Sequence, residues 1–389
     1  MNKFNGVDYF QLESLYSEEE ILVRNTVREF VENEVIPVIE KHYMAGTFPF
    51  DLIPKMAEIG VFGPTLPQKY GCAEMNNVAY GLVMQELERG DSGVRSFASV
   101  QSGLVMYPIF TFGSEEQKDF WLPKLAAGDK IGCFGLTEPD YGSNPGGMIT
   151  KAEKTDGGYI LNGAKMWITN GTIADIAVVW AKLEGTVRGF LVEKGTKGFS
   201  APEMKGKHSL RASITSELVF EDCFIPETNL LPLANGLKAP LMCLNQARYG
   251  IAWGVTGSMM AVYDSALSYA KSRIQFGKPI ASFQLTQQKL VYMLTEITKS
   301  QMMNYHLAKL KDEGKIKHTH ISMAKRNNCE KALEIARIAR EIFGANGILD
   351  EYPVMRHSAN LESVKTYEGT HEMHTLIIGE DITGIAAFE

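Results

Sequence analysis

Two segments of the sequence carry hydroxyl groups, turn-forming residues and aromatic rings at short spacing. Residues 134–143 run from an apolar strand end into a Pro/Gly turn and include the hydroxyls of Thr137 and Ser143. Residues 165–170 add the ring of Trp167 and the hydroxyl of Thr169. Hydroxyls and backbone amides can hydrogen-bond to the edge of a flavin, and an aromatic ring can pack on it. A structural turn and a tryptophan in the core would explain the same residues.

A cation in an apolar segment is the second chemical feature of the sequence. Arg95 precedes a run of small and apolar residues, 96–106, in which an unpaired charge would be expensive to bury. Glu88 and Asp91 are close enough in sequence to be structural ion-pair partners. Alternatively, the guanidinium binds the carboxylate of a substrate, and the spacing alone leaves both interpretations open.

Glu368 is the third feature, in the run Tyr-Glu-Gly-Thr at 367–370. A glutamate beside a glycine is most often a surface loop residue. In a pocket without water, however, desolvation raises the pKa of a carboxylate and makes it a better base for removing a proton from carbon.

These segments together resemble the acyl-CoA dehydrogenase family. The run at 367–370 is similar to the C-terminal signature of the family, in which the glutamate removes the α-proton of an acyl thioester. Residues 134–143 and 165–170 are similar to its two flavin segments, in which the tryptophan packs on the flavin and the threonine faces N5. The resemblance implies FAD as cofactor and Glu368 as catalytic base. The cofactor-binding residues that it implies here are Phe134, Leu136, Thr137, Ser143, Trp167, Thr169 and Thr370.

Two further segments match the family from the C-terminal half. Residues 273–277 resemble a run that reaches the flavin pyrophosphate in a neighbouring subunit, and 341–347 resembles a segment near the adenosine half of FAD. The first could also be an ordinary helix stop, with Arg273 compensating the helix dipole. Ala345 and Asn144 depart from the commoner glycine and aspartate at their positions. The implied cofactor residues are Arg273, Gln275, Phe276 and Glu341.

Within the family, the surroundings of Arg95 look most like those of the glutaryl-CoA dehydrogenases, whose matching arginine binds the far carboxylate of the substrate. The implied activity is oxidative decarboxylation of glutaryl-CoA to crotonyl-CoA and CO₂, with hydride transfer to flavin N5. A structural role for Arg248 remains equally open. The implied substrate-binding residues are Glu88, Arg95, Ser96, Ser99, Asn245, Arg248 and Tyr367.

Several rival functions share much of this pattern. Arg95 argues against a short-chain acyl-CoA dehydrogenase, whose substrate has no far carboxylate for it to bind. Non-decarboxylating glutaryl-CoA dehydrogenases resemble the chain less at Glu88 and Ser96. A catalytically silent member or an oxidase is a more distant alternative. Electron transferring flavoprotein as acceptor and a homotetramer are implied by the resemblance.

Composition narrows the class of protein. The 389 residues carry a net charge of −7, so the basic surface that nucleic-acid binding needs is not expected. No apolar run approaches the roughly 20 residues of a membrane span. The five cysteines form no Cys-x-x-Cys pair, which predicts free thiols and no metal site. A cytoplasmic protein is the simplest expectation, although a mature organellar matrix form would look the same.

The elements that must position these residues follow in three blocks, which predicts an α+β protein. Residues 1–131 show helical periodicity, with Val23, Val27 and Val31 on one face, an expected end or kink at Pro37 and Ser114 as an N-cap. Residues 132–240 show short β-branched runs between turns, including a hairpin bounded by 156–158 and 162–163. Residues 241–389 return to a helical period. An N-terminal helical domain, a middle β-domain and a C-terminal four-helix bundle are therefore predicted.

Overall fold

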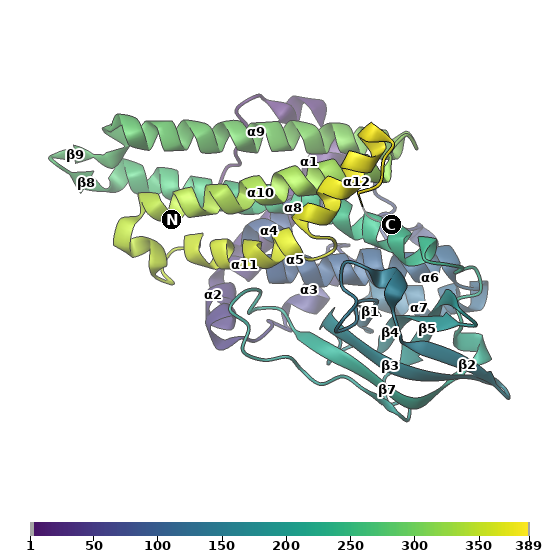
Figure 1. Ribbon diagram of the computed structural model, residues 1–389. Helices are drawn as coiled ribbons and strands as arrows, with labels where there is room; N and C mark the ends of the chain where they lie inside the picture. The colour runs from purple at the N-terminus through teal and green to yellow at the C-terminus, as the bar shows by residue number, and fades with distance from the viewer. Residues whose placement is uncertain (1–3, 388–389) are drawn as a thin grey trace.

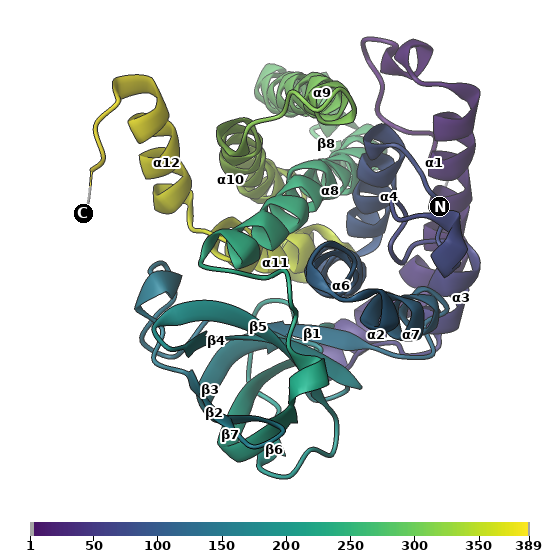
Figure 2. The ribbon, with the colours of Figure 1, turned by 90° about the vertical axis from the view of Figure 1, so that its right-hand side faces the viewer.

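The computed structural model describes residues 4–387, and its helices and strands follow the predicted order. Figures 1 and 2 show a twisted sheet packed beneath a body of long helices, which confirms the α+β architecture. The first strand begins at Gly132, and the long helix that follows the sheet begins at Lys238. The second predicted boundary, 240/241, thus falls inside the first turn of that helix.

The N-terminal region consists of helices, and several of them follow one another directly without an intervening loop. Ser17 and Ser114 begin two of them with a capping box, as expected for a serine followed three residues later by Glu20 or Gln117. The elements are η1 (Leu12–Leu15), α1 (Glu18–Phe30), η2 (Val31–Val35), α2 (Ile36–Ala45), α3 (Leu52–Glu58), η3 (Gln68–Tyr70), α4 (Asn77–Gly90), α5 (Ser92–Ser99), η4 (Val100–Met106), α6 (Tyr107–Phe112) and α7 (Glu115–Ala126).

Prolines change the pitch of two helical runs without ending them. Pro37 lies in the first turn of α2, directly after the π-helical segment η2, so the chain passes from α1 into α2 without leaving the helix. Pro108 stands in the same relation to the π-helical segment η4 and to α6. Proline lacks an N–H, and the wider turn before it accommodates the missing donor. Of the two outcomes expected at Pro37, a helix end or a kink, the structure shows no end, and the helix continues through a π-helical segment.

The sheet is built around β4, which is buried on both faces. Strands β1 and β2 pair with successive parts of one edge of β4 in parallel, and β5 pairs with the other edge in antiparallel. The remaining order is β2-β3-β7-β6. The strands are β1 (Gly132–Gly135), β2 (Lys151–Thr155), β3 (Gly158–Thr169), β4 (Ile176–Leu183), β5 (Thr186–Glu193), β6 (Phe199–Ser200) and β7 (Thr215–Pro226), with short helices η5 (Pro145–Gly147) and η6 (Glu227–Asn229).

Residues 162–163 do not end a hairpin strand, contrary to the sequence prediction. Strand β3 continues past them to Thr169, and its register with β7 shifts between Leu161 and Gly163. Gly163 has φ 142°, and a Cβ there would lie 2.5 Å from Thr150 Oγ1. The glycine therefore forms a bulge, which glycine permits as readily as a turn.

The C-terminal region is dominated by long helices that pack lengthwise (Figure 1). Helix α8 contacts α4 on one side and α10 on the other, while α9 and α11 complete the bundle. A two-stranded hairpin projects beyond the end of α8. The elements are α8 (Lys238–Ser272), β8 (Ile274–Gln275), β9 (Lys278–Pro279), η7 (Ile280–Ser282), α9 (Gln284–Asp312), α10 (His318–Ile342), η8 (Gly344–Ile348), α11 (Val354–Thr366) and α12 (His371–Thr383).

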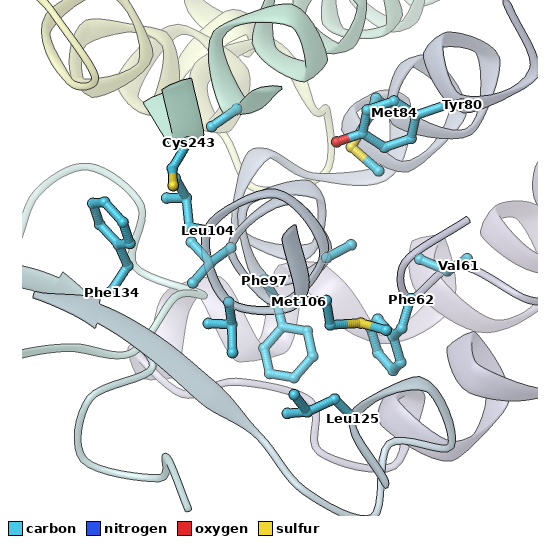
Figure 3. Close-up of a cluster of buried hydrophobic side chains, with 14 of the residues drawn as sticks. Val61, Phe62, Tyr80, Met84, Phe97, Leu104, Met106, Leu125, Phe134 and Cys243 are labelled. Carbon is cyan, nitrogen blue, oxygen red and sulfur yellow. The ribbon is translucent and has the colours of Figure 1, made fainter. Parts of the chain in front are cut away.

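One hydrophobic core joins the N-terminal helices to the sheet. Alternate residues of β4, including Val178 and Trp180, point into this core. Val179, on the other face of β4, packs into a second core made by residues of the β-domain. Figure 3 shows part of the larger core, in which Phe134 from β1 and Cys243 from α8 approach Leu104. The strand that leads into the first predicted flavin segment is thus fixed against the helices. No described helix is long and apolar enough to cross a membrane.

The contact between α4 and α8 depends on a glycine. A Cβ on Gly257 would lie 1.8 Å from Gln85 O and 2.8 Å from Arg89 N, so Gly257→Ala forces the two helices apart. We expect a loss of about 1–3 kcal/mol of unfolding free energy and a lower Tm in calorimetry. Gly379→Ala is the matched control, because nothing lies within 4 Å of its added methyl, and it should leave Tm unchanged or slightly higher. Equal Tm values for the two variants would contradict this packing.

Candidate active site

Glu368 lies in the short connection between α11 and α12, where the backbone is strained. Its φ is 54°, and Gly369 follows with φ 97°. A left-handed conformation is uncommon for glutamate and persists only where neighbouring groups enforce it. A Cβ on Gly369 would lie 3.0 Å from His374 Nε2 and 3.2 Å from Arg248 Nη2, so glycine is the residue that fits there.

Two buried cations hold the carbonyl groups of this connection. Arg248 Nε on α8 donates to Glu368 O at 2.7 Å. Lys325 Nζ on α10 donates to three other carbonyl oxygens, those of Lys365 at 3.2 Å, Tyr367 at 3.0 Å and Gly369 at 2.8 Å. The local conformation of Glu368 is therefore enforced from two different helices.

The Glu368 carboxylate lies in a desolvated and positively charged environment. Its Oε2 atom is buried and has no hydrogen-bond partner in the described residues. Burial raises the pKa of Glu368 above its usual value, while the charges of Arg95, Lys325 and Arg248 act in the opposite direction. These are the conditions under which a carboxylate can act as a general base.

Arg95 is fully buried and uses only part of its hydrogen-bonding capacity. Its Nε donates to Glu88, and its Nη2 donates to the hydroxyl of Tyr367, the neighbour of Glu368. The Nη1 atom has no partner. Burial disfavours the charge of Arg95, but Glu88 and Tyr367 outweigh burial and raise its pKa. The guanidinium is therefore a structural ion-pair partner that keeps one nitrogen available for another acceptor.

The two alternatives for the partner of Arg95 are now distinguished. Glu88 also accepts a hydrogen bond from Ser92 Oγ at 2.6 Å, so its carboxylate is compensated within α4 and α5. Asp91 instead accepts from Arg356 at 2.5 Å and from Gly93 N at 2.6 Å. Glu88 is thus the partner of Arg95, and Asp91 belongs to a separate network.

Further buried polar groups lie near Arg95 and Glu368. The hydroxyls of Tyr80 and Ser99 are buried without a hydrogen-bond partner, and Ser96 is buried as well. Burial raises the pKa of Tyr80, with smaller contributions from the charges of Arg95 and Glu368. This part of the protein can therefore offer several unsatisfied polar atoms to a ligand.

The two predicted flavin segments lie side by side. Lys165 Nζ donates to Leu136 O at 3.1 Å and to Glu138 Oε1 at 2.9 Å, and Met166 N donates to Thr137 O at 2.8 Å. Burial lowers the pKa of Lys165 to about 8, although Glu138 opposes this. The buried ion pair thus ties the end of β1 to the middle of β3.

The surface presented by these segments fits a flat aromatic cofactor. Trp167 is 60 % exposed and has φ 64°, an unusual conformation for a large side chain at a strand end. Asn170 Nδ2 is buried without a partner, and Ser143 is exposed. Phe134 and Leu136 are buried in the core, so only their backbone groups remain for binding.

The other predicted cofactor residues lie elsewhere in the chain. Arg273, Gln275 and Phe276 are exposed at the hairpin beyond α8, at the opposite end of the helical bundle from the sheet (Figure 1). Glu341 near the end of α10 pairs with Lys289 at 2.7 Å. A single chain therefore does not bring these four residues to Trp167. Thr370 is the N-cap of α12, and Asn245 on α8 is half-buried.

Lys325, Tyr80 and Gly254 belong to the site but were not predicted from the sequence. A Cβ on Gly254 would lie 2.8 Å from Glu88 Oε2 and 3.2 Å from Arg95 Nε, so this glycine makes room for the ion pair. A signal for Lys325 was present, because it shares the apolar face of its helix with Ile321 and Ala324. Tyr80 and Gly254 carried no comparable signal in a single sequence.

Three domain families match the chain: the N-terminal domain of acyl-CoA dehydrogenases over residues 17–129, the middle domain over 133–223 and the C-terminal domain over 234–383. The chain belongs to the acyl-CoA dehydrogenase family. An acyl-CoA dehydrogenase of Bacillus subtilis is 38 % identical, covering 95 % of this chain and 99 % of that protein.

Solved structures of glutaryl-CoA dehydrogenase from Mycobacterium smegmatis are also similar to this dehydrogenase. One is 52 % identical with a TM-score of 0.96, covering 97 % of this chain and 98 % of that one. Another, in complex with FADH2, is 49 % identical with a TM-score of 0.97, covering 98 % and 99 %. This acyl-CoA dehydrogenase is a flavin-dependent oxidoreductase with FAD as cofactor, in agreement with the prediction. No cluster of metal ligands occurs among residues 4–387.

The Lys165–Glu138 pair gives a testable consequence for flavin binding. Lys165→Met leaves the buried Glu138 carboxylate without its cation, which should cost about 3–5 kcal/mol and lower the flavin content per chain. Lys151→Met removes an exposed ion pair with Glu153 on the same strand, β2, and should change stability by less than about 1 kcal/mol. Unfolding free energy and absorbance at the flavin band measure both effects. Equal behaviour of the two variants would contradict the proposed tie between the segments.

Proposed function

We propose that this acyl-CoA dehydrogenase oxidises and decarboxylates glutaryl-CoA, giving crotonyl-CoA and CO₂. The observation that carries the proposal is the unpartnered Nη1 of Arg95, fully buried beside Tyr367 and Glu368. A substrate with an uncharged acyl end gives this nitrogen nothing to bind, whereas a far carboxylate gives it an ionic partner. The similarity to glutaryl-CoA dehydrogenases at 52 % and 49 % identity supports the same substrate.

The polar groups around Arg95 suit the far carboxylate of a substrate, because their donors are oriented before it binds. Glu88 fixes the guanidinium through Nε, so that Nη1 is oriented before the substrate binds. Ser99 and Tyr80 carry buried hydroxyls that can donate to the remaining carboxylate oxygens. Preorganised donors lose little reorganisation energy on binding, which favours a dicarboxylic substrate over a simple fatty acyl chain.

Glu368 is the proposed base that removes the α-proton of the thioester. Arg248 and Lys325 hold the carbonyl groups of its loop, which leaves the N–H of Glu368 for the thioester oxygen as negative charge develops there. FAD, when bound, accepts the hydride that leaves Cβ. The products of this half-reaction are glutaconyl-CoA and a protonated Glu368.

Decarboxylation is the second proposed step. The bond between Cγ and the carboxylate breaks, CO₂ leaves, and the electron pair passes into the conjugated thioester as a dienolate. Glu368, protonated in the first step, can return its proton to Cγ to give crotonyl-CoA. Glu88 and Ser96, both buried next to Arg95, favour this outcome over release of glutaconyl-CoA.

Partners follow from the proposed chemistry and the family resemblance. Electron transferring flavoprotein is the proposed acceptor of the two electrons. The exposed hairpin with Arg273, Gln275 and Phe276, the last 92 % exposed, supports a homotetramer in which these residues reach another chain's flavin together with Glu341. The five cysteines are all free and buried, which supports a reducing compartment.

Product identification tests the proposal directly. The purified flavoprotein is mixed with glutaryl-CoA and an artificial electron acceptor, and the acyl products are identified by mass. Crotonyl-CoA with an equal amount of CO₂ is expected. Glutaconyl-CoA as the only product would show that the enzyme does not decarboxylate. Turnover of butyryl-CoA without turnover of glutaryl-CoA would show that the role of Arg95 is purely structural.

The role of Arg95 is tested by removing the ion pair as a unit. Arg95→Gln combined with Glu88→Gln avoids leaving an unpaired buried carboxylate, so folding is less affected than in Arg95→Gln alone. We expect kcat/KM for glutaryl-CoA to fall by about 10²–10⁴-fold, the effect of removing a buried charge partner. The value for butyryl-CoA should change by less than about tenfold. Equal losses for the two substrates would show that the pair only supports the fold.

A further inference from the structure

Lys325 is a fully buried cation on α10 without a carboxylate partner. Its side chain shares one helix face with the buried residues Ile321, Ala324 and Cys329. No ion pair between residues 4 and 387 includes its Nζ atom. A lysine in such a place would normally be replaced by an apolar residue unless its donors were needed.

The three donors of Lys325 are used entirely on the loop that carries Glu368. They bind the carbonyl oxygens of alternate residues, 365, 367 and 369, and Arg248 binds the carbonyl of Glu368 between the last two. An ammonium group has three donors and no acceptor, so this arrangement satisfies it completely. The carbonyl groups of residues 367–369 are thus all directed toward cations in the helical core.

We propose that Lys325 is the positioning residue of the catalytic base, which holds Glu368 in its left-handed conformation and directs the Glu368 N–H toward the substrate. The proposal deepens the assignment of Glu368 as α-proton base and rests on it. Within the described part of the chain, the N–H of Glu368 donates no hydrogen bond, unlike that of Tyr367, which donates to Ser363 O at 2.9 Å.

The charge of Lys325 also acts on the carboxylate. Burial lowers the pKa of Lys325, while the Glu368 charge opposes this, and burial raises the pKa of Glu368, while the Lys325 charge opposes that. Loss of the ammonium should therefore raise the pKa of Glu368 further. Because a base must be deprotonated to work, the acid limb of the rate profile should then move to higher pH.

The titratable or charged groups that face Glu368 are Tyr80 on α4, Glu88 on α4, Arg95 on α5, Arg248 on α8, Lys325 and Cys329 on α10, Tyr367, and His374 on α12.

The titration of His374 does not contribute to the acid limb of the rate profile. Burial and the charges of Lys325 and Arg248 lower the pKa of His374 to about 2, so it is neutral over the pH range in which the enzyme would be assayed. Tyr80 and Tyr367 have raised pKa values and are also neutral there. Among Glu368, His374 and the two tyrosines, Glu368 is thus the group whose titration the acid limb would report.

The test compares Lys325→Met, which has nearly the same length but neither donor nor charge, with Lys325→Arg, which keeps both in a larger group. Lys331→Met, later on the same helix, is the control, because Lys331 pairs with Glu334 and Tyr292 at the outside of the bundle. Glu368→Gln is the reference for complete loss of the base. Each holoenzyme is assayed with glutaryl-CoA and with butyryl-CoA as a function of pH.

A second readout isolates proton abstraction from oxidation. An acyl-CoA with sulfur in place of Cβ cannot lose a hydride, so exchange of its α-hydrogens for deuterium in D₂O reports the base alone. We expect Lys325→Met to slow this exchange and to lower kcat by about 10²-fold, with KM for the substrate changed less than about threefold. Its acid limb should lie at higher pH than in the wild type. Lys325→Arg should have a lower kcat, but its acid limb should lie at the same pH as in the wild type. Lys331→Met should match the wild type in both kcat and the position of the acid limb.

The outcomes separate this proposal from the proposed substrate. An unchanged acid limb and unchanged α-hydrogen exchange in Lys325→Met would overturn the role of Lys325 and leave glutaryl-CoA oxidation standing. A wild-type enzyme that oxidises butyryl-CoA and leaves glutaryl-CoA untouched would overturn the substrate, while the limb measured with butyryl-CoA still decides the role of Lys325. If Lys325→Met does not fold, the position of the limb in Lys325→Arg decides it, because a shift there despite a retained charge would contradict the electrostatic part.

Discussion

The compensation of buried charge between α4, α5, α8, α10 and the loop after α11 is the constraint on which the site depends. Glu88, Arg95, Arg248 and Lys325 all lie in the helical core, where each uncompensated charge would cost several kcal/mol. Glu88 and Arg95 compensate each other across two consecutive helices, but the partners of Arg248 and Lys325 lie in the segment around Glu368, so these two cations are satisfied only after the helices have docked. The catalytic geometry is therefore a consequence of assembling the helical body and does not depend on the loop sequence alone.

Close approach of helices makes that compensation possible. Helix α8 presents glycine where α4 and α5 cross it, and at Gly254 a single methyl would press on both Glu88 and Arg95. The same helix carries Arg248 one turn and a half earlier, directed at the Glu368 carbonyl. One long helix thus supports the cation that would bind the substrate and the cation that holds the proposed base, which fixes the distance between the two proposed functions.

The sequence alone predicted the order of helices and strands and most of the chemical groups, because these depend on local patterns. Glu368, Arg95 and the segments around Thr137 and Trp167 all stand in recognisable runs. It did not predict Lys325 as a partner of residues 40 to 44 positions away, since hydrogen bonds to backbone carbonyls leave no trace in residue types. It also misjudged residues 162–163, where a bulge stands in place of a turn, and at Pro37, where an end or a kink was expected, a π-helical segment lets the helix continue.

The same electrostatics couple substrate recognition to the strength of the base. Arg95 lowers the pKa of Glu368 against the larger effect of burial. If a substrate carboxylate binds Nη1, it neutralises part of that positive charge and displaces remaining water, so the pKa of Glu368 rises. A stronger base would then be present only when the far end of the correct substrate is seated. A substrate without that carboxylate would leave Arg95 Nη1 without a partner and Glu368 a weaker base, so discrimination would fall on the chemical step as well as on binding.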